Sequence, residues 1–128
     1  MNKSLLKLSK DNAFLVAYFD IDNFERFYVY NTLKNEKLWE GKLDLSSNIA
    51  IREDPVKLIL LSYDSHSLFI RGRDKKKIAQ HSLQDGQVIT ESKQLHTNYI
   101  KTFLITKDEK KLITAGIDRK IKIWNWIK

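Results

Sequence analysis

The sequence contains no cysteine, one proline and four glycines in 128 residues. A chain without cysteine forms no disulfide, binds no metal through a cysteine thiolate and performs no thiolate chemistry. The longest apolar runs, residues 14–19 and 58–61, are far shorter than the ~20 residues that span a bilayer. The apolar core within the first seven residues is too short for a signal peptide. We therefore expect no membrane partner, and a cytoplasmic location with the nucleus as the alternative.

Positive charge prevails over negative charge. Lysine and arginine total 23 against 16 acidic residues, which gives a net charge of +7. Apolar residues make up 42% and charged residues 30%, a composition typical of a globular domain. The length allows one compact core. The basic excess is compatible with an acidic protein or a nucleic acid as partner, although most lysines are scattered singly, as on a solvated surface.

The chain contains three related stretches. Each has a polar turn, an apolar run, a second aspartate and a further alternating run. Their turn aspartates, Asp11, Asp64 and Asp108, lie 53 and 44 residues apart. The second spacing is typical of four-stranded propeller blades, and the first requires an insertion, which we place between Leu43 and Asp54.

The apolar runs predict strands. They are five to eight residues long, rich in Ile, Val, Leu, Phe and Tyr, and bounded by turn residues, and none holds a helical period. Pro55 suits the start of a strand, where its missing N–H is harmless. The predicted class is all-β, with eleven strands near residues 3–8, 13–19, 25–32, 37–42, 55–62, 66–72, 76–83, 87–92, 98–105, 111–116 and 120–126.

The third stretch carries the most specific pattern. Leu95-His96 is followed by Leu112-Ile113-Thr114-Ala115-Gly116-Ile117-Asp118 and by Ile121-Lys122-Ile123-Trp124-Asn125. This pattern resembles the WD-repeat β-propeller family. The resemblance implies a structural hydrogen-bond relay of His96, Thr114, Asp118 and Trp124. It also implies a single partial propeller over residues 1–128, with antiparallel four-stranded blades at about 1–43, 55–92 and 96–128.

The other two stretches keep the frame of the pattern with different residues. In the second, Asp74 matches the turn aspartate and His81 stands at the tryptophan position. In the first, Tyr30-Asn31 stands there. Three blades do not close a ring. The chain is therefore interpreted as a segment of a longer propeller, a half-ring that pairs with a copy or another partner, or an open array.

The resemblance also implies a function, that of a non-catalytic scaffold for protein partners. One dense basic cluster lies around the second hairpin of the second stretch, and in the resembled fold such hairpins lie on a rim where partners dock. The predicted rim consists of Arg71, Arg73, Lys75, Lys76, Lys77, Glu53, Asn98 and Arg119. A solvated charged turn is the plainer interpretation of the cluster. A nucleic-acid-binding module is the alternative function, and the absence of an aromatic platform beside the cluster in the sequence weakens it.

Catalysis and metal binding have little support in the sequence. His96 and Asp118 could form an acid–base pair, but no nucleophile motif is present and the repeat accounts for both residues. His66 and His81 lack the spacing of a chelating pair. We expect no enzyme activity, no metal and no cofactor.

Overall fold

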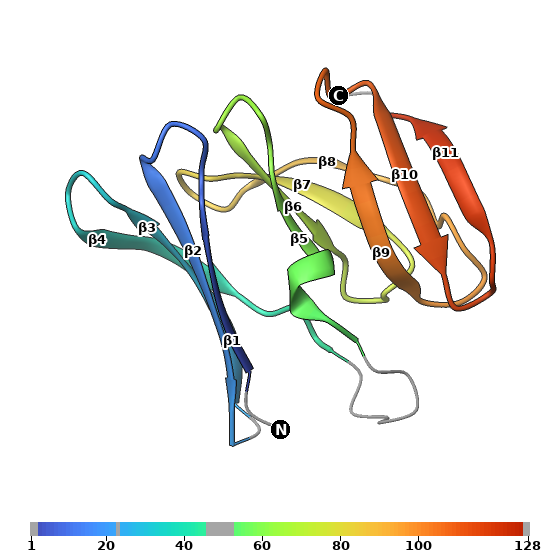
Figure 1. The fold of residues 1–128 in the computed structure, drawn as a ribbon, viewed down its shortest axis with the longest axis horizontal. Helices are drawn as coiled ribbons and strands as arrows, with labels where there is room; N and C mark the ends of the chain where they lie inside the picture. Colours follow the sequence, from blue (N-terminus) through green and yellow to red (C-terminus); the bar gives the residue numbers. More distant parts are fainter. Residues whose placement is uncertain (1–2, 23, 46–52, 127–128) are drawn as a thin grey trace.

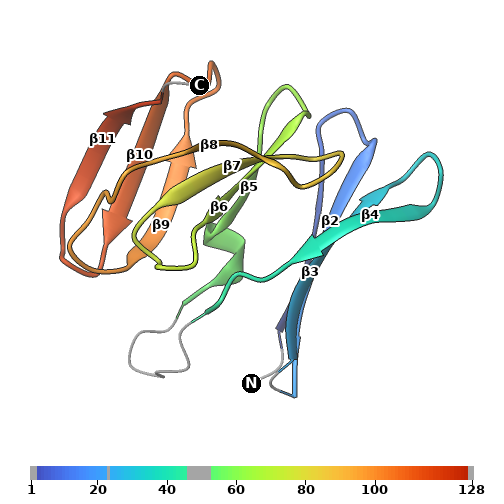
Figure 2. The ribbon, with the colours of Figure 1, turned by 180° about the vertical axis from the view of Figure 1, so that it is seen from behind.

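The computed structural model describes residues 3–22, 24–45 and 53–126, and these ranges form three separate antiparallel sheets (Figures 1 and 2). Sheet 1 has the order β1-β2-β3-β4, sheet 2 the order β5-β6-β7-β8, and sheet 3 the order β11-β10-β9. The strands of sheet 1 are β1 (Lys3–Leu8), β2 (Phe14–Ile21), β3 (Phe24–Asn31) and β4 (Glu36–Gly41). Those of sheet 2 are β5 (Ile59–Leu61), β6 (Ser67–Arg71), β7 (Ile78–Ser82) and β8 (Val88–Glu91). Those of sheet 3 are β9 (Ile100–Ile105), β10 (Lys111–Gly116) and β11 (Ile121–Asn125). The all-β prediction and its eleven strands are confirmed.

The first turn of each sheet has the same construction. The carboxylate oxygen of Asp11, Asp64 or Asp108 accepts a hydrogen bond from the backbone N–H two residues later, at 3.0 Å in each case. The residue between them has positive φ in all three turns. Because an aspartate side chain can replace a backbone acceptor in such a turn, the recurring aspartate fixes where each hairpin reverses.

One predicted strand is wrong in its first half. Residues 55–57 form a 3₁₀ helix, η1 (Pro55–Lys57), and β5 begins only at Ile59. The Asp54 carboxylate accepts a hydrogen bond from the Val56 N–H at 3.1 Å and caps the helix. Proline has no N–H to lose at the first helical position, so Asp54-Pro55 favours a helix start over a strand start. The insertion expected between Leu43 and Asp54 lies largely outside the described residues.

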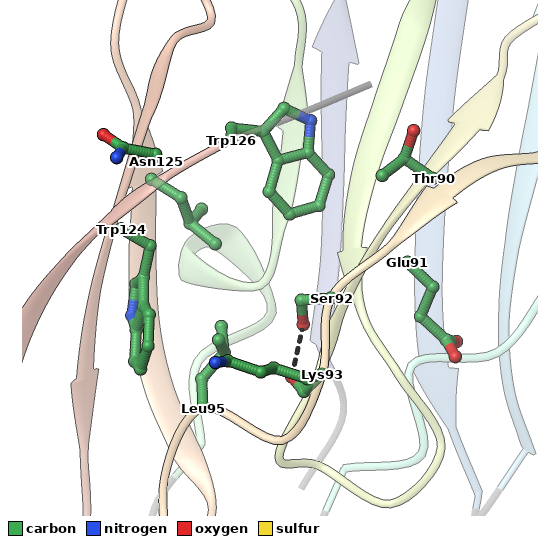
Figure 3. A pocket seen from close by; sticks show the side chains of 9 residues that line it. Thr90, Glu91, Ser92, Lys93, Leu95, Trp124, Asn125 and Trp126 are labelled. Carbon is green, nitrogen blue, oxygen red and sulfur yellow. Dashed lines mark hydrogen bonds between the residues drawn. The ribbon is translucent and has the colours of Figure 1, made fainter.

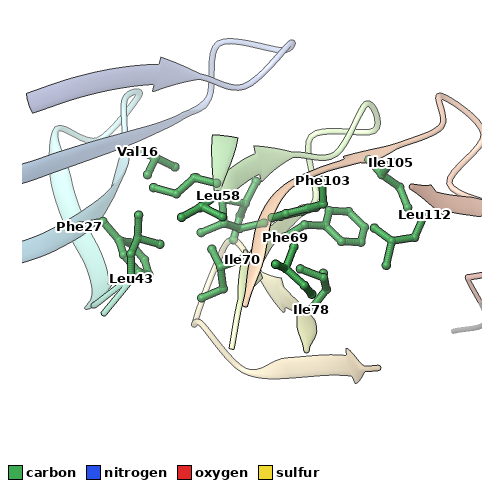
Figure 4. Packing of buried hydrophobic residues seen from close by; sticks show 14 of the residues in the cluster. Val16, Phe27, Leu43, Leu58, Phe69, Ile70, Ile78, Phe103, Ile105 and Leu112 are labelled. Atoms are coloured by element: carbon green, nitrogen blue, oxygen red, sulfur yellow. The ribbon is translucent and has the colours of Figure 1, made fainter. Parts of the chain in front are cut away.

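Each sheet has one face toward the preceding part of the chain and one toward the following part. We call these the N-side face and the C-side face. In sheet 1 the C-side face carries Val16 and Phe27, and in sheet 2 the N-side face carries Ile70. These residues, together with Phe69, Phe103 and Leu112 farther along, form one continuous buried cluster between the sheets (Figure 4). The core therefore lies in the two junctions between consecutive sheets.

No helix among the described residues is long and apolar enough to cross a membrane.

Candidate functional site

A chain of hydrogen bonds runs through sheet 3. Asp118 lies in the β10–β11 hairpin, and its carboxylate oxygens are 2.9 and 3.0 Å from Nδ1 of His96. His96 precedes β9, and its Nε2 is 2.6 Å from Oγ1 of Thr114 in β10. The indole Nε1 of Trp124 in β11 donates to the same oxygen at 3.1 Å. The structure thus joins four side chains, from a loop, a hairpin and two strands, into one relay.

The available protons orient this relay. The indole of Trp124 can only donate, and an ionised Asp118 can only accept. Thr114 therefore accepts from Trp124 and gives its own proton to Nε2 of His96, while Nδ1–H of His96 donates to Asp118. Every side-chain proton of the relay is then donated within the relay, which fits a structural role.

Burial of the Asp118 carboxyl acts to raise its pKa, but hydrogen bonds from His96 and from the Lys120 N–H outweigh burial. The pKa therefore lies below its ordinary value of 3.8. Gly116 lies directly against this pair. A Cβ at Gly116 would be 2.7 Å from both Asp118 Oδ1 and His96 Nδ1, so the contact requires glycine.

The basic rim is assembled from three separate segments. The Leu95 N–H donates to the Lys76 carbonyl at 3.0 Å, and the Ile100 N–H donates to the Lys75 carbonyl at 2.8 Å, which ties the β6–β7 hairpin to residues 95–100. The Ile117 N–H donates to the Tyr99 carbonyl at 2.9 Å, which ties the β10–β11 hairpin to the same segment.

Six of the predicted rim residues lie on these three segments. Arg73, Asn98 and Arg119 are exposed, and Lys75, Lys76 and Lys77 are partly exposed.

Two predicted rim residues do not belong to the rim. Arg71 and Glu53 are buried, with exposed side-chain fractions of 0% and 1%. Their guanidinium and carboxylate groups form a bidentate ion pair, in which Nη2 of Arg71 donates to Oε1 of Glu53 at 3.0 Å. Nη1 of Arg71 also donates to the Ile100 carbonyl at 2.8 Å. Because Arg71 is a strand residue whose side chain points into the junction of sheets 2 and 3, this pair joins the sheets and contacts no solvent.

Tyr99 lies at the rim, although the sequence pattern did not predict it. The Lys75 ammonium lies 5.0 Å from the centre of the Tyr99 ring, within the range of a cation–π contact. The sequence shows no aromatic residue beside the cluster because Lys75 and Tyr99 are distant along the chain. No local pattern signals this contact, which depends on how the hairpin packs against residues 95–100.

The chain was compared with known proteins by sequence and by structure. No family model matches the chain. Pre-mRNA-processing factor 17 of Homo sapiens and its counterpart of Mus musculus are each 24% identical to it over 63 residues, covering 49% of this chain and 11% of theirs. A chain of a mitotic checkpoint complex superposes with a TM-score of 0.62 at 18% identity, over 97% of this chain and 35% of that chain. The C-terminal WD40 domain of Sif2 superposes with a TM-score of 0.63 at 16% identity, over 94% and 30%.

The fold is that of a WD-repeat β-propeller, in partial form. The sequence resemblance to these propellers is confirmed at the level of fold. The chain spans about a third of the length of the structures that it matches. The relay lies in sheet 3.

Sheet 2 has different contacts at the position that corresponds to Trp124 of sheet 3. Strand pairing places His81 opposite Leu68, as Trp124 lies opposite Leu112 in sheet 3. The ring of His81 stacks on Trp39 of β4 at 5.8 Å, and its Nδ1 is 2.8 Å from the Gly86 carbonyl. The histidine at the tryptophan position thus contacts the neighbouring sheet through Trp39, and its own sheet through the backbone carbonyl of Gly86.

The described residues line a cavity on each side of sheet 2. One of about 150 Å³ lies between sheets 2 and 3 beside β11, and Leu95, Leu112, Trp124 and Trp126 form its apolar part (Figure 3). A wider groove of about 530 Å³ separates sheets 1 and 2 and includes Arg73. Within the described ranges, no group of three or more His, Cys, Asp or Glu side chains is placed to hold a metal.

Proposed function

We propose that this chain is a non-catalytic protein-interaction scaffold, that it is part of a larger propeller, and that partners dock on its basic rim. WD40 structures are the neighbours of its fold, which supports a scaffold in general terms. The docking surface is supported by the backbone hydrogen bonds that tie together the three segments bearing Arg73, Lys76 and Arg119. Within the described part of the chain these three side chains form no ion pair.

The histidine–aspartate pair supports a scaffold better than a catalyst. A general base needs a free lone pair within reach of a substrate proton. The Nε2 lone pair of His96 is occupied by Thr114, and the imidazole is fully buried. In this proposal His96 and Asp118 hold sheet 3 together, and the cytoplasm or the nucleus is the location.

Charge reversal at the rim tests the docking surface. The variant Arg73→Glu/Lys76→Glu/Lys77→Glu should lose partners that the wild-type chain retains from a cell extract. The matched control, Lys10→Glu/Lys34→Glu/Lys110→Glu, makes the same charge change on exposed turns at the opposite end of the sheets. Proteins retained by wild type and control but not by the rim variant are the expected result. Equal retention by all three proteins would remove the rim from the proposal.

A nucleic-acid-binding module is the second candidate, and the Tyr99 ring beneath Lys75 is the observation that favours it. Aromatic rings beside cations form stacking platforms for bases. Binding of random single-stranded oligonucleotides should then weaken steeply with salt. It should also weaken in Tyr99→Leu. A shallow salt dependence with no effect of Tyr99→Leu would favour the protein-partner proposal.

A further inference from the structure

The N-side face of sheet 1 is apolar and uncovered. Strand pairing places Leu6 opposite Ala17, Leu8 opposite Leu15, and Phe24 opposite Ile21 on this face. Leu6 is 68% exposed and Phe24 is 53% exposed, and Leu8, Phe19 and Ile21 are exposed as well. An antiparallel sheet with one solvated face normally carries polar residues there. This face therefore has the composition of a buried surface.

The C-side face of sheet 3 has the same character. Ile113 of β10 lies between Leu104 of β9 and Ile123 of β11, and Ile121 is opposite Ala115. The exposed fractions are 76% for Ile121, 66% for Ile123 and 59% for Leu104. Eight of the thirteen exposed large apolar residues in the described ranges lie on these two faces. Sheets 1 and 3 are the two ends of the row of sheets (Figure 1), so the exposed apolar residues are concentrated at those ends.

These two faces are of the kinds that already pack against each other inside the chain. At the first junction the C-side face of sheet 1 meets the N-side face of sheet 2, where Trp39 stacks on His81 and donates to the Leu83 carbonyl at 2.8 Å. At the second junction the C-side face of sheet 2 meets sheet 3, where Phe69 contacts Trp126 edge to face at 5.7 Å. The C-side face of sheet 3 and the N-side face of sheet 1 are the two faces that no other described sheet covers.

We propose that a second copy of this chain covers both faces. The C-side face of sheet 3 of one copy packs on the N-side face of sheet 1 of the other, and the reverse junction forms between the same two copies. Each contact repeats, between chains, the packing order found twice within the chain. Two copies supply six sheets, a number within the range of closed propellers. Each junction joins two different faces, and a two-fold axis relates the two junctions, so the dimer interface as a whole is isologous.

The charged groups on the N-side face of sheet 1 are compatible with this contact. Arg26 and Lys37 both interact with Glu40, at 3.7 and 3.0 Å. The Lys37 ammonium also lies 5.6 Å from the centre of the Tyr28 ring, and the Arg26 guanidinium lies 5.0 Å from that of Phe24. Charges that are paired on their own face lose less on contact with an aliphatic surface than isolated charges would.

Two single-face variants test the proposal by light scattering after size exclusion. The N-side variant is Leu6→Lys/Leu8→Lys, and the C-side variant is Ile121→Lys/Ile123→Lys. The wild-type chain should have twice its 15.1 kDa mass. Each variant alone should be monomeric, with self-association weakened roughly 100-fold, because two ammonium groups enter every junction. Leu33→Lys is the matched control. Leu33 is 82% exposed in the β3–β4 turn, off both faces, so this variant should dimerise as the wild type does.

Mixing the two variants gives the decisive result. One junction between them joins two wild-type faces, so the mixture should form a 1:1 heterodimer that the separate variants do not form. Absence of that heterodimer overturns the head-to-tail arrangement. So does a C-side variant that still dimerises, since the contact would then be between two N-side faces. A folded wild-type monomer overturns the second copy as occupant and leaves the faces to sheets of another chain.

Folding is checked separately in every protein by far-UV circular dichroism. Should the C-side lysine variant lose the β spectrum, Ile121→Thr/Ile123→Thr replaces it, because threonine retains the β-branched shape that strands favour. A folded threonine variant with wild-type dimer affinity would also overturn the proposal. Failure here would leave the rim proposal intact, because the rim residues lie on neither face.

Discussion

The paired substitutions Gly116→Ala and Gly72→Ala test whether the relay holds sheet 3 together. The two glycines are equivalent, each two residues before the aspartate of its hairpin. A Cβ at Gly116 would be 2.7 Å from the two atoms that form the His96–Asp118 hydrogen bond. A Cβ at Gly72 would have no atom closer than 3.5 Å, an ordinary contact. Neither backbone is in the left-handed region, so only the surroundings differ.

The expected effects have opposite sign. A methyl group at Gly116 must separate the imidazole from the carboxylate, and a buried N–H without an acceptor costs about 1–3 kcal/mol. Replacing glycine by alanine also restricts the unfolded chain, which contributes about 0.4–1 kcal/mol of stability at a compatible site. Gly72→Ala should therefore stabilise the protein by about 0.4–1 kcal/mol. Gly116→Ala should destabilise it by about 1 kcal/mol, the difference between the middle of the cost range and the middle of the entropic gain.

Urea unfolding followed by tryptophan fluorescence measures both free energies of unfolding. Protein concentration is kept equal throughout, because self-association adds to apparent stability. Equal urea midpoints for the two variants would mean that the His96–Asp118 contact contributes nothing to the free energy of unfolding, contrary to this prediction. The same substitution is also made in His96→Ala, which already lacks the imidazole. If Gly116→Ala causes no further decrease in the urea midpoint there, the destabilisation is due to the His96–Asp118 contact.

Three further substitutions probe the same fold. Thr114→Val removes the hydroxyl between His96 and Trp124 and should cost about 2–4 kcal/mol in urea unfolding, whereas a cost below about 0.5 kcal/mol would mean that the relay is not formed. Arg71→Met leaves the Glu53 carboxylate buried without its guanidinium and should lower the free energy of unfolding by about 3–5 kcal/mol. The double variant Arg71→Met/Glu53→Leu should restore most of this loss. An equal loss of stability in the single and double variants would argue against the ion pair. Because the Asp118 pKa is lowered on folding, its contribution is present above about pH 3.8 and is lost as the pH falls through the lower folded value. Asp118→Asn should flatten the acid limb of the stability curve, and an unchanged limb would exclude Asp118 from it.

The strand pattern and the hairpins were predictable because their causes are local. Alternating apolar residues specify a strand with one buried face wherever it lies, and an aspartate at the start of a tight turn supplies its own acceptor. Apart from the strand that η1 shortens, the predicted strand limits differ from the observed ones by at most two residues. The error at Pro55 has the same origin, since a helix cap and a strand start present similar local sequences. Here the helix forms because the Asp54 carboxylate accepts a hydrogen bond from the Val56 N–H.

Long-range packing decided what the charged residues do. Arg71 and Arg73 are two positions apart in a basic run, yet one is a buried structural cation and the other an exposed rim residue. Sequence composition does not separate them, because burial of Arg71 depends on Glu53 and on the Ile100 carbonyl from distant segments.

The amino-acid sequence by itself determined an all-β chain of three related sheets and a relay of residue types able to satisfy one another. Tertiary structure alone determined which surfaces remain open. The isoleucines of β11 are exposed and the aliphatic residues of β6 are buried, because other sheets cover both faces of sheet 2 and only one face of sheet 3. The physical reason is that backbone preferences act over a few residues, whereas removal of apolar surface from water depends on the next sheet along the row.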